Sequence, residues 1–303
     1  MDRFGLLCRN IYEKKKITQR ELAAAMDLSL GTCNHLIRDA LADGLIALDP
    51  QTGEYSLLKK GVELLQKYRV NSAVILAAGF GSRFVPLTFE TPKGLLEVFG
   101  ERMIERQIKQ LHEVGIHDIT IAVGYLKEKF AELEKMYYGV KLIENPYYDI
   151  CNNISSLYVA RNYIENAIIL DGDQIICNPQ VLAPEFERSG YNSIWTEEET
   201  NEWLQTVENG IVTSCSRKGG NKGWQLYGIS RWTAEDGRKL KHHLEIEFEY
   251  KKNWQIYWDD VVMFCYPTEY QLGIHPMNKG DVIEVDNFSE LIALDDSYKK
   301  YLE

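Results

Sequence analysis

The stretch Ala73-Val-Ile-Leu-Ala-Ala-Gly-Phe-Gly-Ser-Arg-Phe84 decides the fold of most of this 303-residue chain. Residues 73–76 form a short apolar run, as expected for a parallel strand that is covered on both faces. Gly79 and Gly81 follow at once, and they lack the Cβ atoms that would keep a phosphate away from backbone N–H groups. The stretch therefore predicts a buried strand that runs into a phosphate-binding loop.

Two cations stand just beyond this loop, at Arg83 and at Lys93 within Thr91-Pro-Lys93. Phe84 occupies the place where a dinucleotide fingerprint needs glycine, and no Walker-type Gly-Lys-Ser/Thr follows. An ordinary strand–loop–helix turn is the alternative, but the combined pattern resembles the signature of nucleotidylyltransferases that activate phosphorylated small molecules. The nucleotide-binding residues expected here are Leu76, Ala77, Ala78, Gly79, Gly81, Ser82, Arg83 and Lys93.

Charge is distributed unevenly along the sequence. The formal net charge of -11 excludes a chain that binds nucleic acid or an anionic membrane over its whole surface. Residues 1–70 carry 11 Lys/Arg against 9 Asp/Glu, whereas the rest carries 23 against 36. The six cysteines include no Cys-x-x-Cys pair, which predicts reduced thiols in a cytoplasmic protein and no structural zinc site. No long apolar segment is present, which predicts no membrane contact.

The first 70 residues read as a small domain of their own. Thr18 and Glu21 have the spacing of a capping box at the start of one helix, and Ser29 can cap the start of a second. Short apolar segments on either side of residues 49–53 then predict a β-hairpin.

Two helices followed by a hairpin resemble the winged helix-turn-helix domain of many bacterial transcription regulators, over residues 1–68. The resemblance implies DNA binding, and a homodimer is expected because one copy offers few cations. The alternative is a packing or dimerisation module that does not touch DNA, because so small an excess of positive charge is weak for a phosphate binder. The candidate DNA contacts on the second helix are Thr32, Asn34, His35 and Arg38.

From residue 71 to residue 303, strand and helix patterns alternate. Apolar strand segments stand at 73–77, 118–123, 140–143 and 167–170. This alternation predicts an α/β fold with a doubly wound, mostly parallel sheet, Rossmann-like as in nucleotidylyltransferases, preceded by the winged-helix domain. Ligands of such sheets bind beyond the carboxyl ends of the strands, where both the glycine loop and Asp171-Gly-Asp173 fall.

Carboxylates follow two of the predicted strands. Asp171 and Asp173 come directly after one apolar segment, and Asp286 comes after another. Mg2+ binds few protein oxygens and keeps water and phosphates as its other ligands. We therefore expect Asp173 and Asp286 to bind Mg2+ and to form the catalytic group with Arg83 and Lys93. The alternative is a set of aspartates that cap turns.

Aromatic residues are frequent in the C-terminal half. Trp203 and the run Tyr257-Trp258-Asp259 stand out among them. Most such residues belong to cores. Aromatic faces beside a carboxylate also suit a quaternary ammonium, which cannot donate a hydrogen bond. The residue types alone leave both interpretations open.

Residues 72–303 resemble the bacterial CTP:phosphocholine cytidylyltransferases in a series of motifs that stand in the family's order. These motifs are Leu76 to Phe84, Thr91-Pro-Lys93, Val123-Gly-Tyr-Leu-Lys-Glu128, Asn152-Asn153 with Ser156-Leu-Tyr158, Asp171-x-Asp173, Asn201-Glu-Trp203, Tyr257-Trp-Asp259 and Glu284-x-Asp286. The resemblance implies an enzyme that transfers CMP from CTP to phosphocholine, with Mg2+ as cofactor. The winged helix is a departure, because the simplest members of that family lack it.

Roles for individual residues follow from the same resemblance. Lys93 and the glycine loop would hold the triphosphate, and Asp171 would also bind the nucleotide. Asp173 and Asp286 would bind Mg2+. Asn153 and Ser155 would contact cytosine. The residues expected around choline are Trp203, Tyr257, Trp258 and Asp259.

Three other functions stay open on the sequence. A cytidylyltransferase for phosphoethanolamine or an aminophosphonate would favour carboxylates and carbonyls over aromatic faces. A sugar-1-phosphate nucleotidylyltransferase would need polar groups for hydroxyls. A transcription regulator that only senses a nucleotide or a choline metabolite would not need Lys93, Asp173 and Asp286 together.

Overall fold

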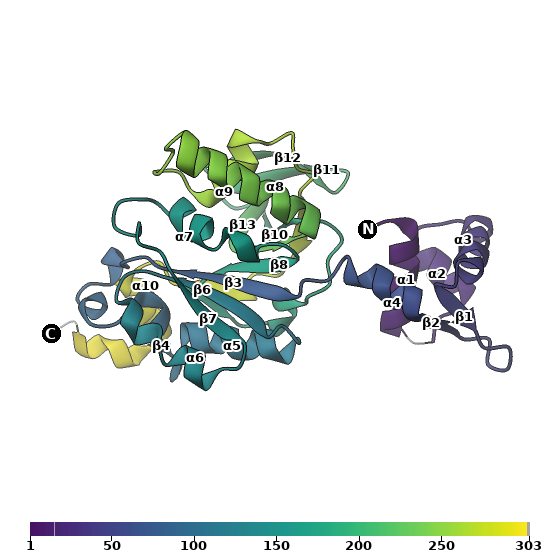
Figure 1. Cartoon of the computed structure of the whole chain (residues 1–303), viewed down its shortest axis with the longest axis horizontal. Helices are drawn as coiled ribbons and strands as arrows, with labels where there is room; N and C mark the ends of the chain where they lie inside the picture. Colours follow the sequence, from purple (N-terminus) through teal and green to yellow (C-terminus); the bar gives the residue numbers. More distant parts are fainter. Residues whose placement is uncertain (15, 302–303) are drawn as a thin grey trace. The chain divides into compact units, whose positions relative to one another are not determined.

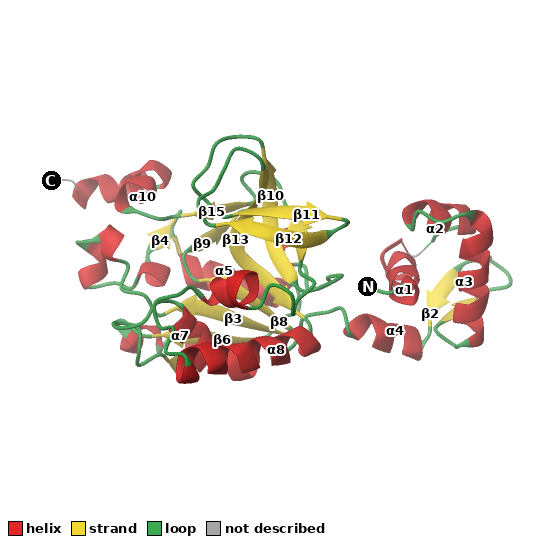
Figure 2. Ribbon diagram, turned by 90° about the horizontal axis from the view of Figure 1, so that it is seen from above, coloured by secondary structure: helices red, strands yellow, loops and turns green. Residues whose placement is uncertain are grey.

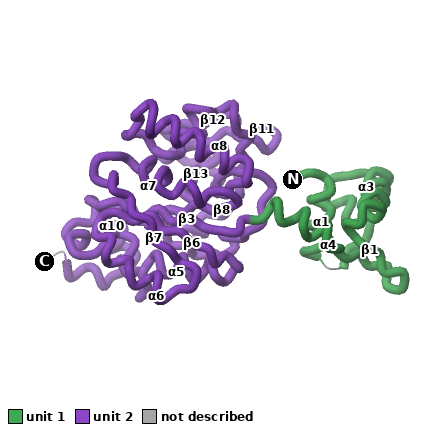
Figure 3. Tube along the Cα trace, in the orientation of Figure 1, with its two compact units in different colours: residues 1–69 green, residues 70–303 purple. Residues whose placement is uncertain are grey.

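The computed structural model describes residues 1–14 and 16–301. They form two compact units, residues 1–69 and residues 70–303, which Figure 3 shows in different colours. The boundary predicted from the sequence lies after residue 70. Within the described part of the chain, no helix is long and apolar enough to cross a membrane.

The first unit is a winged helix. Its elements are α1 (Arg3–Lys14), α2 (Gln19–Ala25), α3 (Leu30–Ala42), β1 (Ile46–Leu48), β2 (Tyr55–Leu57) and α4 (Lys59–Gln66). Thr18 and Glu21 form the predicted capping box at the start of α2, and the Ser29 side chain accepts a hydrogen bond at the start of α3. The two strands pair antiparallel. Leu22 and Ile37 lie in the buried core that joins the helices to the hairpin.

The second unit is built on one nine-stranded sheet. Its central strands are β8 (Ala167–Asp171), β3 (Ser72–Ala77), β6 (Asp118–Val123) and β7 (Val140–Glu144), which lie side by side in this order and run parallel. This arrangement confirms the predicted parallel core. The later strands continue the sheet beyond β8, mostly antiparallel: β13 (Gly223–Trp232), β11 (Leu204–Glu208), β12 (Ile211–Ser216), β10 (Gly190–Thr196) and β14 (Gly273–Pro276).

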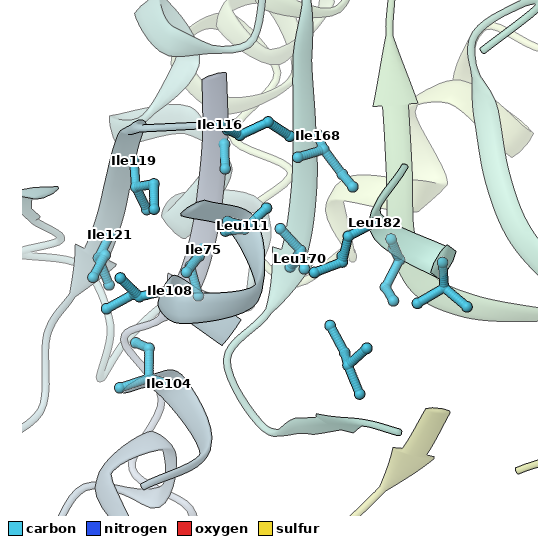
Figure 4. Close-up of a cluster of buried hydrophobic side chains, with 14 of the residues drawn as sticks. Ile75, Ile104, Ile108, Leu111, Ile116, Ile119, Ile121, Ile168, Leu170 and Leu182 are labelled. Carbon is cyan, nitrogen blue, oxygen red and sulfur yellow. The ribbon is translucent and has the colours of Figure 1, made fainter. Parts of the chain in front are cut away.

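Helices cover both faces of this sheet. Figure 1 shows α5 (Met103–Glu113) and α6 (Leu133–Met136) on one face, with α7 (Ile154–Val159) and α8 (Ala234–Glu245) on the other. Side chains of β3 alternate between two cores, as the two-residue period of a strand requires. Ile75 packs with Ile104 and Ile108 of α5 (Figure 4), whereas Val74 lies in the core with Leu240 of α8. The run 73–76 is therefore apolar throughout because both of its faces are buried.

A small sheet brings the C-terminal carboxylates to the main sheet. Strands β9 (Gln174–Ile176) and β15 (Val282–Glu284) pair antiparallel, with Glu284 opposite Gln174, and Figure 2 shows them side by side. Residues far apart in the sequence thus meet where β8 ends. The remaining short elements are β4 (Glu97–Val98), β5 (Glu101–Arg102), α9 (Trp258–Asp260) and α10 (Phe288–Leu294).

The alternation of strand and helix patterns predicts a helix over residues 126–136, but the helix that forms is shorter. Leu126 has a left-handed backbone with φ 48°, a single 3-10 turn follows over Lys127–Phe130, and the α-helical part is α6 alone. A left-handed residue cannot lie inside an α-helix, so the predicted helix cannot begin at Leu126.

Candidate active site

The loop after β3 contains two glycines with different roles. Gly81 is required by its backbone conformation, and Gly79 leaves space for a ligand. Gly81 has φ 67°, and a Cβ there would lie 3.1 Å from Cγ2 of Thr88 and 3.2 Å from Cβ of Lys93. Thr88 also donates a hydrogen bond from Oγ1 to the Gly81 carbonyl at 3.0 Å. At Gly79, in contrast, a Cβ would meet no atom within 4 Å. Gly79 therefore leaves open space at the loop surface, where a ligand can approach the backbone.

A pocket of ≈ 420 Å³ lies against this loop. Asn152, Gly94 and Gly172 line it together with most of the predicted nucleotide-binding residues. Those predicted residues are Leu76, Ala77, Gly79, Gly81, Ser82, Arg83 and Lys93, and the predicted metal ligand Asp173 lines the pocket as well. Ala78 is buried behind the loop, where its carbonyl accepts a hydrogen bond from the Tyr125 N–H at 3.1 Å.

Each predicted phosphate-binding cation lies against one predicted metal ligand. Nζ of Lys93 is 2.7 Å from Oδ2 of Asp173, and Nη2 of Arg83 is 3.0 Å from Oδ1 of Asp286. The two pairs differ in burial, because the Lys93 side chain is 12% exposed and that of Arg83 is 65% exposed. The structure thus brings together all four predicted catalytic residues, which are spread over two hundred positions of the sequence.

Asp171 lies deeper than Asp173. Burial raises the pKa of Asp171 well above its usual range, and so do the nearby charges of Asp173, Asp259 and Glu284, while Lys93 acts in the opposite direction. Gly228 on β13 makes room for this carboxyl group, since a Cβ there would lie 1.9 Å from Oδ2 of Asp171. Asp171 therefore joins the phosphate side of the site to a second group of carboxylates.

Glu284 belongs to that second group, although no role was predicted for it. Its Oε1 accepts a hydrogen bond from Nε2 of Gln174 at 2.8 Å, and burial raises its pKa to about 7. The charges of Asp173 and Asp286 raise that pKa further, which places both metal candidates near Glu284. The strand pairing of β9 and β15 that creates this contact joins residues more than a hundred positions apart, so no local pattern could have shown it.

Gln107 is another residue that the sequence reasoning missed. It is fully buried on α5, and its Nε2 donates hydrogen bonds at 2.9 Å to the carbonyl oxygens of Asp171 and Gln174. These two bonds bracket the turn that carries Asp173. A signal was available, because Gln107 interrupts the apolar stripe of Ile104 and Ile108.

The predicted choline-binding aromatic residues divide into two groups. Trp203 and Tyr257 form an edge-to-face pair with ring centroids 5.9 Å apart, and Tyr257 is 48% exposed. Trp258, in contrast, is 2% exposed and stacks on Tyr191 in the core. The expectation that Trp258 surrounds a ligand is therefore wrong for its side chain, because the turn of α9 directs it inward.

The Arg217 side chain places a positive charge next to the pair of Trp203 and Tyr257. No sequence pattern predicted this contact. Its Cζ lies 5.8 Å from the Trp203 ring centroid and 3.9 Å from that of Phe264. Nε of Arg217 is 2.7 Å from Oδ1 of the buried Asp260. The second oxygen of Asp260 accepts the Tyr257 N–H at 2.9 Å, so Arg217 and Asp260 together hold the turn that begins α9.

Asp259 follows on the same turn, and the Oδ1 atom of its half-buried carboxyl group is buried. Burial raises its pKa to about 7, and the nearby Tyr191 hydroxyl lowers that pKa in part. Within residues 1–14 and 16–301, Oδ1 of Asp259 has no hydrogen-bond partner. A buried carboxylate oxygen without a partner is unfavourable, and a cationic ligand would relieve the imbalance.

Asn153 and Ser155, predicted to contact cytosine, use their side chains inside the protein. Oδ1 of Asn153 accepts the Trp258 N–H at 2.9 Å. Ser155 is 1% exposed, and its hydroxyl donates to the Asn152 carbonyl at 2.8 Å while it accepts from Asn145 at 3.0 Å. The expected cytosine contact of the Ser155 hydroxyl is therefore wrong, because that hydroxyl is buried and already bonded.

The described residues hold no cluster of three or more His, Cys, Asp or Glu side chains that is arranged to bind a metal ion. Mg2+ needs fewer protein ligands than such a cluster provides, because one or two carboxylates, substrate phosphates and water complete its octahedral coordination. The side chains of Asp173 and Asp286 are 38% and 43% exposed, so their hard oxygen ligands are accessible and fit this ion.

Comparison with known proteins gives relatives for both units. The sequence profile of the MobA-like NTP transferase domain matches residues 73–231, and that of a winged helix-turn-helix DNA-binding domain matches residues 9–47. The 2-aminoethylphosphonate cytidylyltransferase of Lancefieldella rimae is 35% identical over 229 residues, which are 75% of this chain and 93% of the relative. The choline-phosphate cytidylyltransferase of Streptococcus pneumoniae is 32% identical over 227 residues, 75% of this chain and 98% of the relative.

A solved structure extends this likeness to three dimensions. The CTP:phosphocholine cytidylyltransferase from Streptococcus pneumoniae superposes with a TM-score of 0.70 at 33% sequence identity. The match covers 76% of this chain and 99% of that one.

Proposed function

Because the chain belongs to the MobA-like NTP transferase family and is a cytidylyltransferase within it, we propose that it transfers CMP from CTP to phosphocholine, yielding CDP-choline and pyrophosphate. The observation that carries the proposal is the pairing of Lys93 with Asp173 and of Arg83 with Asp286 beside the glycine-loop pocket. Before CTP binds, the cations proposed to bind phosphates, Lys93 and Arg83, neutralise the carboxylates proposed to bind the metal ion, Asp173 and Asp286.

The transfer requires no base and no protein nucleophile. Phosphocholine is a phosphomonoester, whose second pKa is about 6, so its phosphate is largely dianionic at neutral pH. One of its oxygens attacks the α-phosphorus of CTP, the bond to the bridging oxygen of the β-phosphate breaks, and pyrophosphate leaves with that electron pair. Lys93 and Arg83 neutralise the charge that develops on pyrophosphate, so the protein contributes mainly positioning and electrostatics.

Asp173 and Asp286 are the residues that would hold Mg2+. The ion would reduce the repulsion between the α-phosphate of CTP and the attacking phosphate. Lys93 would then no longer pair with Asp173 and would be free to bind phosphate oxygens.

The trimethylammonium group of phosphocholine would lie against Trp203 and Tyr257, above Asp259. An edge-to-face aromatic pair offers a π face to a cation, and the unpartnered oxygen of Asp259 supplies the counter-charge. Trp258 supports this place from the core without lining it.

A second candidate acceptor is 2-aminoethylphosphonate, and a specific observation favours it. The charges of Asp259 and Glu284 both raise the pKa of Asp171, so the two carboxyl groups lie near Asp171 and the three together offer several acceptors to a primary ammonium. Arg217 already lies near the Trp203 ring and leaves less aromatic surface for three methyl groups. The Lancefieldella rimae relative carries the name of this activity.

A pyrophosphate-release assay with CTP and a panel of acceptors distinguishes the candidates. The panel contains phosphocholine, phosphoethanolamine, 2-aminoethylphosphonate and glucose 1-phosphate. We expect phosphocholine to give the highest kcat/KM. A clear preference for 2-aminoethylphosphonate would select the second candidate, and turnover of the sugar phosphate alone would overturn both.

For the winged-helix unit we propose DNA binding as a homodimer. Support comes from α3, on which Thr32, Asn34, His35 and Arg38 are exposed, as on a recognition helix. The hairpin loop carries Asp49 and Glu54 and no cation, so α3 and the lysines next to the hairpin must supply the phosphate contacts. Two copies on a two-fold site would double those contacts.

A further inference from the structure

Four hydrogen bonds connect the segment 150–153 to the segment 254–258. Three of them lie at the start of the second segment. The Asn152 N–H donates to the Trp254 carbonyl at 2.7 Å, Nδ2 of Asn152 donates to the Gln255 carbonyl at 3.2 Å, and Nε2 of Gln255 donates to the Ile150 carbonyl at 2.8 Å. The two segments thus form one connected structure between the nucleotide pocket and the turn that carries Asp259.

The fourth bond is made by Asn153, whose Oδ1 accepts the Trp258 N–H at 2.9 Å. Trp258 is the first residue of α9, where a helix N–H has no partner within its own helix. The preceding N–H, of Tyr257, is accepted by Asp260. Asn153 and Asp260 therefore fix the two N–H groups from which the turn of Asp259 begins.

Two adjacent asparagines thus face different parts of the site. Asn152 lines the pocket next to the glycine loop, and its Oδ1 accepts the Asn153 N–H at 2.7 Å. Asn153 uses its own oxygen on the other side, toward α9. The side chain predicted to bind cytosine is therefore bonded to the part of the structure that presents Asp259.

We infer that Asn153 is a positioning residue for the acceptor's ammonium group, which acts through Trp258 to hold Asp259 in place. This inference rests on the proposed function, in which the ammonium group binds beside Asp259. Loss of the Asn153 oxygen leaves the Trp258 N–H without its partner in a buried place, and the turn relaxes to reach another acceptor. The displaced carboxylate then binds the ammonium group less well, while the glycine-loop pocket is unchanged.

The test compares Asn153→Ala with Asn153→Asp in the full-length chain. Aspartate keeps an acceptor oxygen at the same distance from the backbone, whereas alanine has none. We expect Asn153→Ala to raise the KM for the better acceptor of the panel about tenfold, the effect of a lost hydrogen bond of ordinary strength, with the KM for CTP within about twofold. Asn153→Asp should keep the acceptor KM near the wild-type value.

Asn145→Ala is the matched control. Asn145 is also buried, and its Nδ2 donates to Ser155 at 3.0 Å and to Ser156 at 3.1 Å on α7. Its side-chain hydrogen bonds among the described residues go to these two serines and to the Tyr147 N–H, and not to α9. It should lower the melting temperature without a selective change in the acceptor KM. If Asn153→Ala is insoluble, Asn153→Ser gives the same comparison, because a serine hydroxyl is too short to reach Trp258.

The outcomes separate this inference from the function on which it rests. Wild-type protein that releases no pyrophosphate with any amine acceptor would refute the proposed function. Active wild-type protein whose Asn153→Ala variant has a raised KM for CTP, and an unchanged acceptor KM, would refute the positioning role and restore the cytosine contact. Isothermal titration with phosphocholine alone should show the same loss of acceptor affinity in Asn153→Ala and not in Asn145→Ala.

Discussion

Replacement of Lys93 by methionine should remove most of the turnover while the protein stays folded. Methionine keeps an unbranched chain of similar length beside Gly81 and over the Phe84 ring, from whose centroid Nζ lies 4.7 Å away. The substitution therefore deletes the charge and little of the packing. Lys93→Arg, which keeps the charge at a different reach, is the matched control.

The magnitude follows from the position of the ammonium group. It is mostly buried and 2.7 Å from Asp173, so it acts on bound phosphates with little screening by water. Removal of one preorganised charge-stabilising donor lowers kcat by about 10²–10³-fold, equivalent to ~2.7–4 kcal/mol in the transition state. Unfolding free energy should fall by only about 1 kcal/mol, because Asp173 keeps access to water.

Steady-state kinetics with CTP and the preferred acceptor, together with urea unfolding, measure both quantities. Turnover of Lys93→Met within threefold of wild type would refute the view that Lys93 stabilises the leaving pyrophosphate. A loss of turnover that only matches the loss of folded protein would also contradict this view of Lys93. Lys93→Arg keeps the charge, so comparison of the two variants separates loss of charge from loss of folded protein.

Three further predictions concern the second carboxylate group and the winged helix. Gly228→Ala should reduce stability by ~1–3 kcal/mol in urea unfolding and lower kcat, because its Cβ would overlap Asp171. Gly31→Ala on α3 has room for the added atom and should keep or slightly raise stability, because alanine is the better helix former. Since burial raises the pKa of Asp259 to about 7, that carboxyl is neutral at lower pH, so the acceptor KM should fall as pH rises through about 7. Asp259→Asn should weaken this dependence and leave only the part due to the acceptor's own phosphate, which titrates at about pH 6. Arg38→Ala should weaken the binding of promoter DNA in a mobility-shift assay, and the slope of log binding constant against log salt concentration should become shallower by about one. Wild-type protein that binds no DNA at low salt would refute the DNA-binding role.

The contact between Lys93 and Asp173 could be predicted because one rule of topology places both residues. Parallel strands present their carboxyl ends at the same edge of a sheet, so the loop after β3 and the turn after β8 had to meet. Lys93 and Asp173 are in direct contact for this reason. The pairing of β9 with β15, which brings Asp286 and Glu284 to the same place, is a long-range contact that no local pattern encodes.

The aromatic site was predicted less well, because a tryptophan suits a core and a ligand equally. In the run 257–259 the turn of α9 exposes Tyr257 and buries Trp258. The direction of that turn depends on Asn153 and Arg217, which lie far away in the sequence. Residue types alone therefore indicated the place and not the orientation of its side chains.

The most direct test of the central claim is the identity of the product. The protein is incubated with CTP, Mg2+ and phosphocholine, and in parallel with ATP, GTP or UTP, and the products are identified by phosphorus NMR and mass spectrometry. We predict CDP-choline and pyrophosphate in equal amounts with CTP, and little product with the other three nucleotides. Release of phosphate in place of pyrophosphate, or a product that lacks the acceptor, would contradict the account of CMP transfer at this site.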